Sequence, residues 1–361
     1  MKRLIAGMVA ALLAAVLAFP LRVEAISAQK AILFDGNSGR VLFDRNAYDR
    51  GLIASTTKIM TALIVCEQCN VLDRFRIPKE AVGVEGSSVY LREGEVWTVQ
   101  ELLYGLMLHS GNDAAVALAI YCSGTVEGFV GLMNDKAHRL GLKNTAFENP
   151  HGLDGPGHYS TPYDMAVLAD YAMENPVFRK TVSTKTVRAG NRSLRNHNKL
   201  LWRMEGADGV KTGFTKAAGR ILVSSSLRQG RRLVAVTMDA PNDWEDHISL
   251  MNDGFSRYRM RLIIPEGSVV GYAEVAGGEA GSVPLIASEE FAYPLAEGEA
   301  PEVILQKPGF VYAPAVQGDA AGYAYVCIGD NTVGKVPLYF GETVEQLKEV
   351  KKSFIEKLLG W

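Results

Sequence analysis

Strands on either side of a mainly helical stretch are the feature that most constrains the fold of this chain. Residues 208–241, DGVKTGFTKAAGRILVSSSLRQGRRLVAVTMDAP, change to a period of two and are rich in Val, Ile and Leu, as is typical of β-strands. Residues 30–47, KAILFDGNSGRVLFDRNA, show two short apolar runs around a Gly-Asn-Ser-Gly turn and predict a hairpin. Helical patterns fill the sequence between them, so we predict an α+β fold whose mixed or antiparallel sheet is assembled from distant parts of the chain.

The helical patterns and their end signals predict where the helices lie around this sheet. The interruption at 110–112 and the glycines Gly141 and Gly254 are expected to end helices, and Ser160 or Thr161 is expected to cap one ahead of Pro162. The predicted helices are Ser55 to about Val65, 98–122 with its interruption, 125–142, 159–176 and 243–254. We therefore expect helices to flank the predicted sheet.

The composition divides the chain further. The 361 residues are more than one comfortable domain needs, and the formal charge of −2 gives no basic field for binding nucleic acid. We expect the first domain at 26–262. Residues 263–343 have short alternating runs broken by Gly, Pro and Glu, which predict a small β-sandwich-like domain.

The two ends predict where the chain works. Residues 1–25 have Lys2 and Arg3 before an apolar stretch and small residues near the end, the pattern of a secretory signal; the alternative is an uncleaved membrane anchor. Residues 344–361 have apolar side chains at helical spacing beside lysines and end in Trp361. This segment either packs on its own domain or lies in a membrane interface as an amphipathic helix. We expect an exported protein that works outside the cytoplasm.

The pair Ser55 and Lys58, at the head of the apolar run in LIASTTKIMTAL, is the first candidate for chemistry. A serine at a helix start exposes its hydroxyl beside unpaired N–H groups that favour an oxyanion. Three residues on, the lysine amine lies on the same face, and burial can make it a neutral base. A capped helix with an outward lysine is the alternative.

Two further short motifs accompany this pair. Ser110-Gly111-Asn112 breaks a helical region, where a glycine is costly without a reason. Lys211-Thr212-Gly213 opens a predicted strand, where the glycine lets the backbone of a ligand approach the strand edge closely. The order S-x-x-K, S-x-N, K-T-G is the set found in penicillin-binding proteins and class A β-lactamases.

With these motifs, the sequence resembles the D-alanyl-D-alanine carboxypeptidases, low-molecular-mass penicillin-binding proteins of the serine peptidase type. The resemblance runs from about Ala31 to Tyr258, and ASTTKIMTAL, ELLYGLMLHSGNDAAVALA and DGVKTGFTKAAGRILVSS carry much of it. It implies a penicillin-recognition fold without metal or cofactor, a peptidoglycan pentapeptide ending in D-Ala-D-Ala as substrate, and β-lactam antibiotics as inhibitors. It also favours the membrane interpretation of residues 344–361.

The resemblance implies roles for the motif residues. Ser55 is acylated, Lys58 takes its proton, Ser110 relays a proton to the leaving D-alanine, and Asn112 holds the acyl side chain and the lysine. The substrate carboxylate is expected at the K-T-G strand, and the oxyanion hole at the backbone N–H groups of Ser55 and Phe214. The residues predicted to bind substrate are Lys211, Thr212, Gly213, Phe214 and Arg220.

Two positions depart from the family pattern. Ile53 stands where a proline is usual, and the place of the carboxylate-binding arginine falls near Asp246. Arg220, on the strand expected to pair with the K-T-G strand, is our candidate replacement; the alternative is an exposed strand arginine.

Three other functions were weighed. A β-lactamase would need an activated water, and Glu148 lies in the corresponding region but without the matching pattern. A zinc peptidase would use His151, Asp154 and His158, although a turn fixed by glycines explains that segment better. A non-catalytic binding protein of the same fold is expected to have lost a motif.

The C-x-x-C spacing of Cys66 and Cys69 permits a strained disulfide, but we predict that these residues are two buried thiols.

Overall fold

The computed structural model describes residues 26–348 of the chain. The predicted signal segment, residues 1–25, and residues 349–361 of the predicted terminal helix lie outside this range. The described chain forms two compact units, one up to Ser256 and the other from Arg257 onward.

A five-stranded antiparallel sheet is the centre of the first unit. Its order is β2-β1-β9-β8-β7, and Lys30 of β1 pairs with Met238 of β9, so the beginning and end of this unit meet in the middle of the sheet. The predicted hairpin and the distant origin of the sheet are confirmed. The strands are β1 (Lys30–Asp35), β2 (Val41–Arg45), β7 (Ala207–Thr215), β8 (Gly219–Arg228) and β9 (Arg231–Met238).

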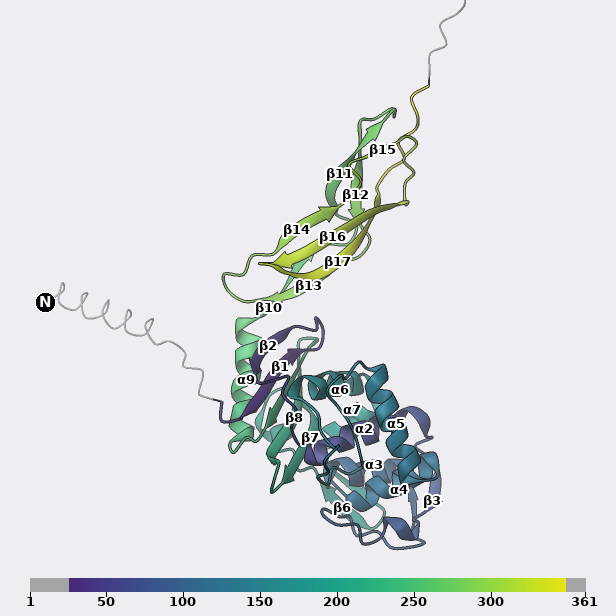
Figure 1. Cartoon of the computed structure of the whole chain (residues 1–361), viewed down its shortest axis with the longest axis vertical. Coiled ribbons are helices and arrows are strands. Elements are labelled where there is room, and N and C mark those ends of the chain that lie inside the picture. Colours follow the sequence, from purple (N-terminus) through teal and green to yellow (C-terminus); the bar gives the residue numbers. More distant parts are fainter. Residues whose placement is uncertain (1–25, 349–361) are drawn as a thin grey trace, which may run out of the picture. The chain divides into compact units, whose positions relative to one another are not determined.

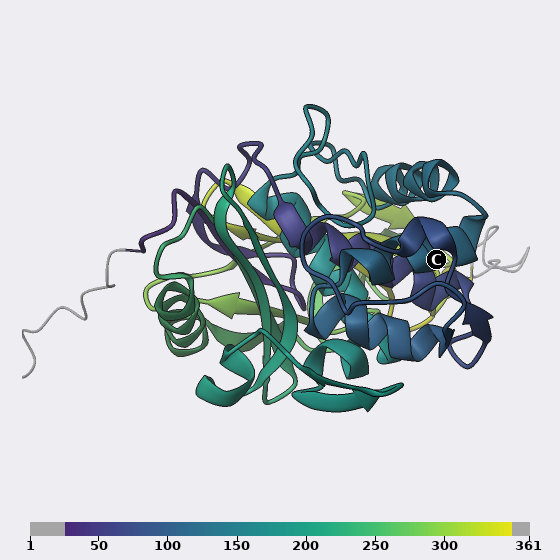
Figure 2. The ribbon, with the colours of Figure 1, turned by 90° about the horizontal axis from the view of Figure 1, so that it is seen from below.

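Helices cover both faces of this sheet (Figures 1 and 2). One face carries α9 (Asp243–Arg257), whose buried His247 contacts the hydroxyls of Ser224 on β8 and Thr237 on β9 at 2.6 and 2.9 Å. The other face contributes apolar side chains, among them Ile32 and Val236, to a large core shared with the remaining helices. Burial of these apolar faces is the main driving force for this arrangement.

The local sequence explains most of the helix ends. Thr98 and Glu101 form a reciprocal capping box at α3, and Thr161 caps α6 ahead of Pro162. The remaining elements of this unit are η1 (Ala54–Thr57), α2 (Lys58–Gln68), β3 (Arg74–Arg76), η2 (Lys79–Ala81), β4 (Val96–Thr98), α3 (Val99–Leu108), α4 (Asn112–Ser123), α5 (Val126–Arg139), α6 (Pro162–Glu174), α7 (Pro176–Ser183), β5 (Thr186–Ala189), β6 (Arg192–Arg195) and α8 (Leu200–Arg203).

The second unit contains strands only, within the residues that the structure describes. Its larger sheet has the order β14-β16-β17-β12-β11-β15, with β11 and β15 parallel, and β10 pairs with β13. A separate small core includes Val283, Leu285 and Val336. The strands are β10 (Arg259–Ile264), β11 (Val269–Ala276), β12 (Ser282–Ala287), β13 (Phe291–Leu295), β14 (Glu302–Gln306), β15 (Phe310–Tyr312), β16 (Ala320–Ile328) and β17 (Asn331–Phe340).

Three predicted limits differ from the structure. The first unit ends at Ser256 rather than at residue 262, because β10 crosses that point and pairs with β13. Helix α9 continues past Gly254, where a Cβ would lie 2.5 Å from Leu33 Cδ2; this glycine serves close packing on the sheet and does not end the helix. The terminal helix does not begin at Val344, whose backbone pairs with Ala315.

The helices of the described residues are short compared with the thickness of a bilayer. Among residues 26–348 no single helix is both long and apolar enough to span one. The helices α4 and α5 reach the required length only as a pair, and they are bent by 85° where they meet.

Candidate active site

Ser55 lies in a tight turn that leads into a buried helix. The turn is the short η1 helix, and α2 begins at Lys58, so the predicted helix start is confirmed with its first turn tightened. Ala54, just before Ser55, has a φ of 44°. This left-handed conformation costs a non-glycine residue about 1–2 kcal/mol, and such strain is concentrated at functional sites. The hydroxyl of Thr57 donates to the Ala54 carbonyl at 2.8 Å and helps to hold the turn.

The Lys58 amine has three polar neighbours in a buried position. Its Nζ lies 3.0 Å from Ser55 Oγ, 2.7 Å from Asn112 Oδ1 and 2.6 Å from the carbonyl oxygen of His151. Burial, and then the charge of Lys211, hold the pKa of Lys58 well below its ordinary value. A neutral amine has two N–H donors and one lone pair. When Lys58 is neutral, the two carbonyl oxygens accept its two hydrogens, and its lone pair is left for the proton of Ser55.

The S-x-N segment meets this amine from the start of α4. The backbone N–H of Asn112 donates to Ser87 O at 2.7 Å, and its side-chain amide donates to Glu85 O, so the side-chain oxygen is turned toward Lys58. Ser110 is buried and has a φ of 64°, a second left-handed residue in the site. The S-x-N motif is therefore held by backbone contacts that orient Asn112.

A buried carboxylate secures the loop that covers this segment. Asp113 accepts hydrogen bonds from the Ser88 hydroxyl at 2.6 Å and from the backbone N–H groups of Val89 and Leu91 at 3.1 and 3.0 Å. Three bonds to one buried carboxylate are a strong local constraint. Asp113 thus fixes the loop whose carbonyl oxygens hold Asn112.

The K-T-G segment lies within β7, the edge strand of the sheet, and not at its beginning as predicted. Lys211 is buried; burial lowers its pKa to about 7, and its ammonium donates to Thr212 O at 2.8 Å. A Cβ on Gly213 would lie 3.3 Å from the carbonyl oxygen of Ile53 and from Ala54 Cβ. The space beside this glycine is therefore taken by the chain's own turn, and the approach of a ligand backbone stays a prediction. Thr212 is half-buried, and the Phe214 side chain is exposed.

The loop with His151 and His158 supports the nucleophile turn. A Cβ on Gly152, which has a φ of 94°, would overlap the Ala54 carbonyl oxygen. His158 contacts the Thr57 hydroxyl through Nε2 at 2.7 Å and accepts the N–H of Glu148 at Nδ1 at 3.0 Å. Burial lowers the pKa of His151 and of His158 to about 4, so both are neutral. Within residues 26–348 no three His, Cys, Asp or Glu side chains are grouped as metal ligands.

Arg220 and Asp246 have partners inside the protein. Arg220 donates to both carboxylate oxygens of Asp243 at 2.8 Å, and its guanidinium lies over the ring of Trp244. Asp246 accepts hydrogen bonds from the backbone and hydroxyl of Ser27. Asp246, near the place where the resemblance implies an arginine, holds the beginning of the first unit. The use of Arg220 as a carboxylate ligand stays a prediction.

The structure thus brings the three predicted motifs together around one turn. Sequence reasoning missed the carbonyl oxygen of His151, because a backbone acceptor leaves no mark on residue type. It also missed the left-handed backbone at Ala54 and Ser110. The close packing of Gly152 against Ala54 was indicated only by the glycine-rich sequence of the loop, which does not identify the segment that packs against it.

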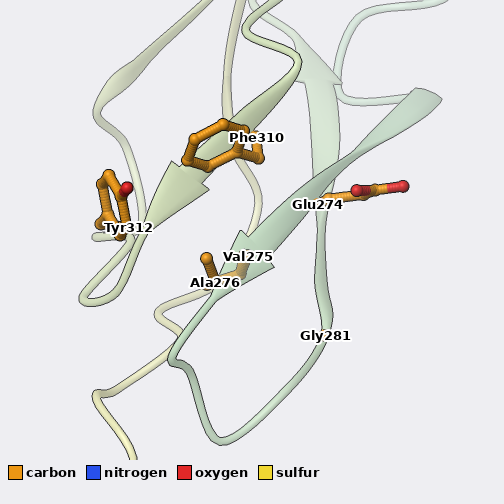
Figure 3. A pocket seen from close by; sticks show the side chains of 6 residues that line it. All are labelled: Glu274, Val275, Ala276, Gly281, Phe310 and Tyr312. Atoms are coloured by element: carbon orange, nitrogen blue, oxygen red, sulfur yellow. The ribbon is translucent and has the colours of Figure 1, made fainter.

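A second hollow lies in the C-terminal unit, with a volume of about 520 Å³. Figure 3 shows the exposed rings of Phe310 and Tyr312 at one side, and the carboxylate of Glu274 directed away from them. Glu274 is the one charged side chain among the residues that line the hollow. Nothing in it resembles the base and nucleophile of the first unit.

The fold and the Ser55 site together define an active-site serine hydrolase of the penicillin-binding class. Residues 18–242 match the family model described as D-alanyl-D-alanine carboxypeptidase, and residues 258–346 match the C-terminal domain of penicillin-binding protein 5. The chain belongs to the D-alanyl-D-alanine carboxypeptidase family.

Individual relatives agree with this assignment. The chain is 36% identical over 285 residues to the D-alanyl-D-alanine carboxypeptidase DacF of Bacillus subtilis, which covers 75% of this chain and 73% of the relative. It is 33% identical over 346 residues to DacC of Escherichia coli, covering 89% and 85%. The structure of penicillin binding protein 5 from Haemophilus influenzae matches with a TM-score of 0.77 at 29% identity, over 91% of this chain and 100% of that chain. The predicted penicillin-recognition fold with an appended all-β domain is confirmed.

Proposed function

We propose that this chain removes the terminal D-alanine from peptidoglycan pentapeptide stems through an acyl-enzyme on Ser55. The single observation that supports this most is the contact of a buried Lys58 amine with Ser55 Oγ, while two carbonyl oxygens occupy its remaining donors. An amine in that state is a base directed at one hydroxyl.

The first step forms the bond between Ser55 Oγ and the carbonyl carbon of the penultimate D-alanine. Lys58 takes the serine proton, and the backbone N–H groups of Ser55 and Phe214 bind the oxyanion. Ser110 relays a proton to the nitrogen of the leaving D-alanine as the C–N bond breaks. Asn112 keeps the amine in place and binds the acyl side chain. Water then releases the shortened peptide.

The substrate carboxylate belongs at the K-T-G strand in this proposal. Lys211 supplies a buried positive charge and Thr212 a hydroxyl, and Gly213 lets the turn that carries Ser55 lie close to this strand. Arg220 can add to this charge only by sharing its guanidinium with Asp243, whose carboxylate it already contacts at both oxygens. We therefore assign the main role in carboxylate binding to Lys211 and Thr212.

β-Lactam antibiotics enter the same site as mimics of D-Ala-D-Ala and acylate Ser55. The alternatives remain a β-lactamase-like hydrolase and a non-catalytic protein of the same fold. Glu148, the carboxylate considered for activating water, accepts the N–H of Gly157 at 3.0 Å, which is a role in holding its own loop. That contact favours slow release of penicillin over fast hydrolysis.

Export and membrane contact complete the proposal. They are supported by the pattern of residues 1–25 and by the apolar and lysine-rich spacing of residues 344–361. We propose that the catalytic unit works at the outer face of the cytoplasmic membrane.

Mass spectrometry of a disaccharide pentapeptide incubated with residues 26–348 tests the reaction. We expect loss of one alanine, and loss of a dipeptide would contradict the proposal. Labelling by a fluorescent penicillin tests the nucleophile separately. We expect no labelling of Ser55→Ala, whereas unchanged labelling of that variant would show that another residue is acylated. Penicillin turnover as fast as labelling would support the β-lactamase instead.

A further inference from the structure

The two helices that bring the active-site residues together also bring two thiols together at their other ends. Helix α2 begins at Lys58 and is followed by Cys69, and α4 begins at Asn112 and has Cys122 in its last turn. The first residues of the helices are joined by the hydrogen bond of 2.7 Å between Lys58 Nζ and Asn112 Oδ1. At the far ends, the Cys69 and Cys122 side chains interact through a thiol hydrogen bond.

The surroundings of these thiols are defined by several contacts. The Cys122 sulfur also lies 3.8 Å from the Gln68 side-chain oxygen, next to Cys69 in the chain. Tyr121, adjacent to Cys122, stacks on Phe75 with ring centroids 4.4 Å apart and donates to Asp73 at 2.7 Å. The ends of the two helices are thus held side by side by groups other than the thiols.

Cys66 does not share this arrangement, although the C-x-x-C spacing suggests it as the partner of Cys69. Cys69 has extended backbone angles, φ −111° and ψ 145°, and therefore lies beyond the helical part of the chain. Cys66 is inside α2, where burial raises the pKa of its thiol to about 12. The pKa of the Cys69 thiol is raised as well, first by its contact with Cys122 and only in smaller part by Cys66, so Cys122 is its main thiol neighbour.

We propose that Cys69 and Cys122 form a disulfide that ties α2 to α4. The expected oxidant is a disulfide, either of a thiol–disulfide oxidoreductase or of a small molecule such as oxidised glutathione. Both cysteines are half-buried rather than enclosed, so a small oxidant can reach them. Export, where disulfides persist, would favour the bond, but the chemistry can be tested without it.

The steps follow from the hydrogen bond between the thiols. The donor, Cys69, lowers the pKa of the Cys122 thiol, so Cys122 attacks as the thiolate. It forms a mixed disulfide with one half of the oxidant and releases the other half as a thiol. Cys69 then loses its proton and attacks the Cys122 sulfur, which releases the second half. Two thiols are oxidised to one disulfide, and the oxidant's disulfide is reduced to two thiols.

The test equilibrates the full chain with glutathione mixtures, from fully reduced to a large excess of the oxidised form. Remaining thiols are then alkylated after denaturation and counted by mass. We expect two of the four thiols to disappear, and Cys66→Ser, the matched control on the same helix, to lose two as well. Cys122→Ser should keep its three. Fragmentation of the cross-linked peptide from Cys66→Ser should join residues 69 and 122.

A structural readout accompanies the thiol count. Because the bond closes a long loop, oxidation should raise the Tm of the wild type and of Cys66→Ser by about 5 °C or more, and leave Cys122→Ser unchanged. Four thiols that persist at every glutathione ratio would overturn the proposal. So would a bond between Cys66 and Cys69 in the wild-type peptide map, which needs no variant to fold. Penicillin labelling of the same samples reports the proposed activity separately.

Discussion

Replacing Asn112 by aspartate is expected to change the charge state of Lys58 and, with it, the pH dependence of acylation. The new carboxylate would take the place of an amide oxygen 2.7 Å from Lys58 Nζ. Two unit charges at that separation attract by about 6 kcal/mol at an effective dielectric constant of 20. Desolvation of the buried carboxylate offsets part of this. Opposite charges this close typically move a pKa by about one to three, so we expect the pKa of Lys58 to rise by about two.

The sign of the effect follows from the role of the amine. Lys58 must be uncharged to accept the Ser55 proton, so a higher pKa moves the rising limb of the rate toward alkaline pH. On that limb the variant should be acylated about 100-fold more slowly than the wild type, because a rise of about two in the pKa leaves correspondingly less neutral amine. The measurement is the second-order rate of labelling by a fluorescent penicillin at closely spaced pH values. We expect the ratio of variant to wild-type rates to increase with pH; taking the ratio cancels the titration of other groups.

Asn112→Ala is the matched control, because it removes the acceptor without adding a charge. It leaves a buried N–H donor unpaired, which lowers the free energy of unfolding by about 1–3 kcal/mol, and it removes a contact that positions the amine, so acylation should be slower. Because no carboxylate is added, the ratio of this variant's rate to the wild-type rate should not increase with pH. If the aspartate variant shows the same flat ratio as the alanine variant, the titration of Lys58 does not control acylation, and the assignment of the base is wrong.

Three further outcomes are expected. Since the Lys211 ammonium is lost as pH rises through its pKa of about 7, kcat/KM on the pentapeptide should fall above that pH, and a flat profile to pH 9 would contradict carboxylate binding by this lysine. Gly152→Ala should lower the free energy of unfolding by about 3 kcal/mol or more in a denaturant titration. The control Gly124→Ala should lower it by only about 1 kcal/mol, because Gly124 has a similar positive φ but open space around it. Equal losses would mean that the structure relaxes to remove the contact with Ala54. Arg220→Ala should reduce kcat/KM less than tenfold, because Asp243 already holds the guanidinium, and a loss above 100-fold would make Arg220 a principal carboxylate ligand.

Much of the fold could be predicted because its signals are local. The alternation of Val, Ile and Leu in β8 and β9, the glycine turn of the first hairpin, and the cap of α6 each depend on residues close together in sequence. The residues at which helices and strands begin and end were harder to predict from the sequence. Gly254 looks like a helix end in the sequence, but the close approach of Leu33 from a distant strand determines why a glycine is there.

The active site divides in the same way. The order of the motifs predicted that Ser55, Lys58 and Asn112 would lie together, because the side chains named in those motifs are the ones that the reaction needs. The sequence could not show that the His151 carbonyl accepts from the same amine, nor that Asp243 pairs with Arg220. Both contacts depend on where segments far apart in the chain come to lie.

The amino-acid sequence by itself determined the periodicities of the strands and helices, the three motifs and the reaction that they imply. Only the tertiary structure decided that the lysine is buried with two carbonyl oxygens on its donors, and that the thiol of Cys69 interacts with that of Cys122 from another helix. The physical reason is that residue type records local backbone preference and burial, whereas a pKa or a thiol pair depends on which distant groups share a small volume of low dielectric constant.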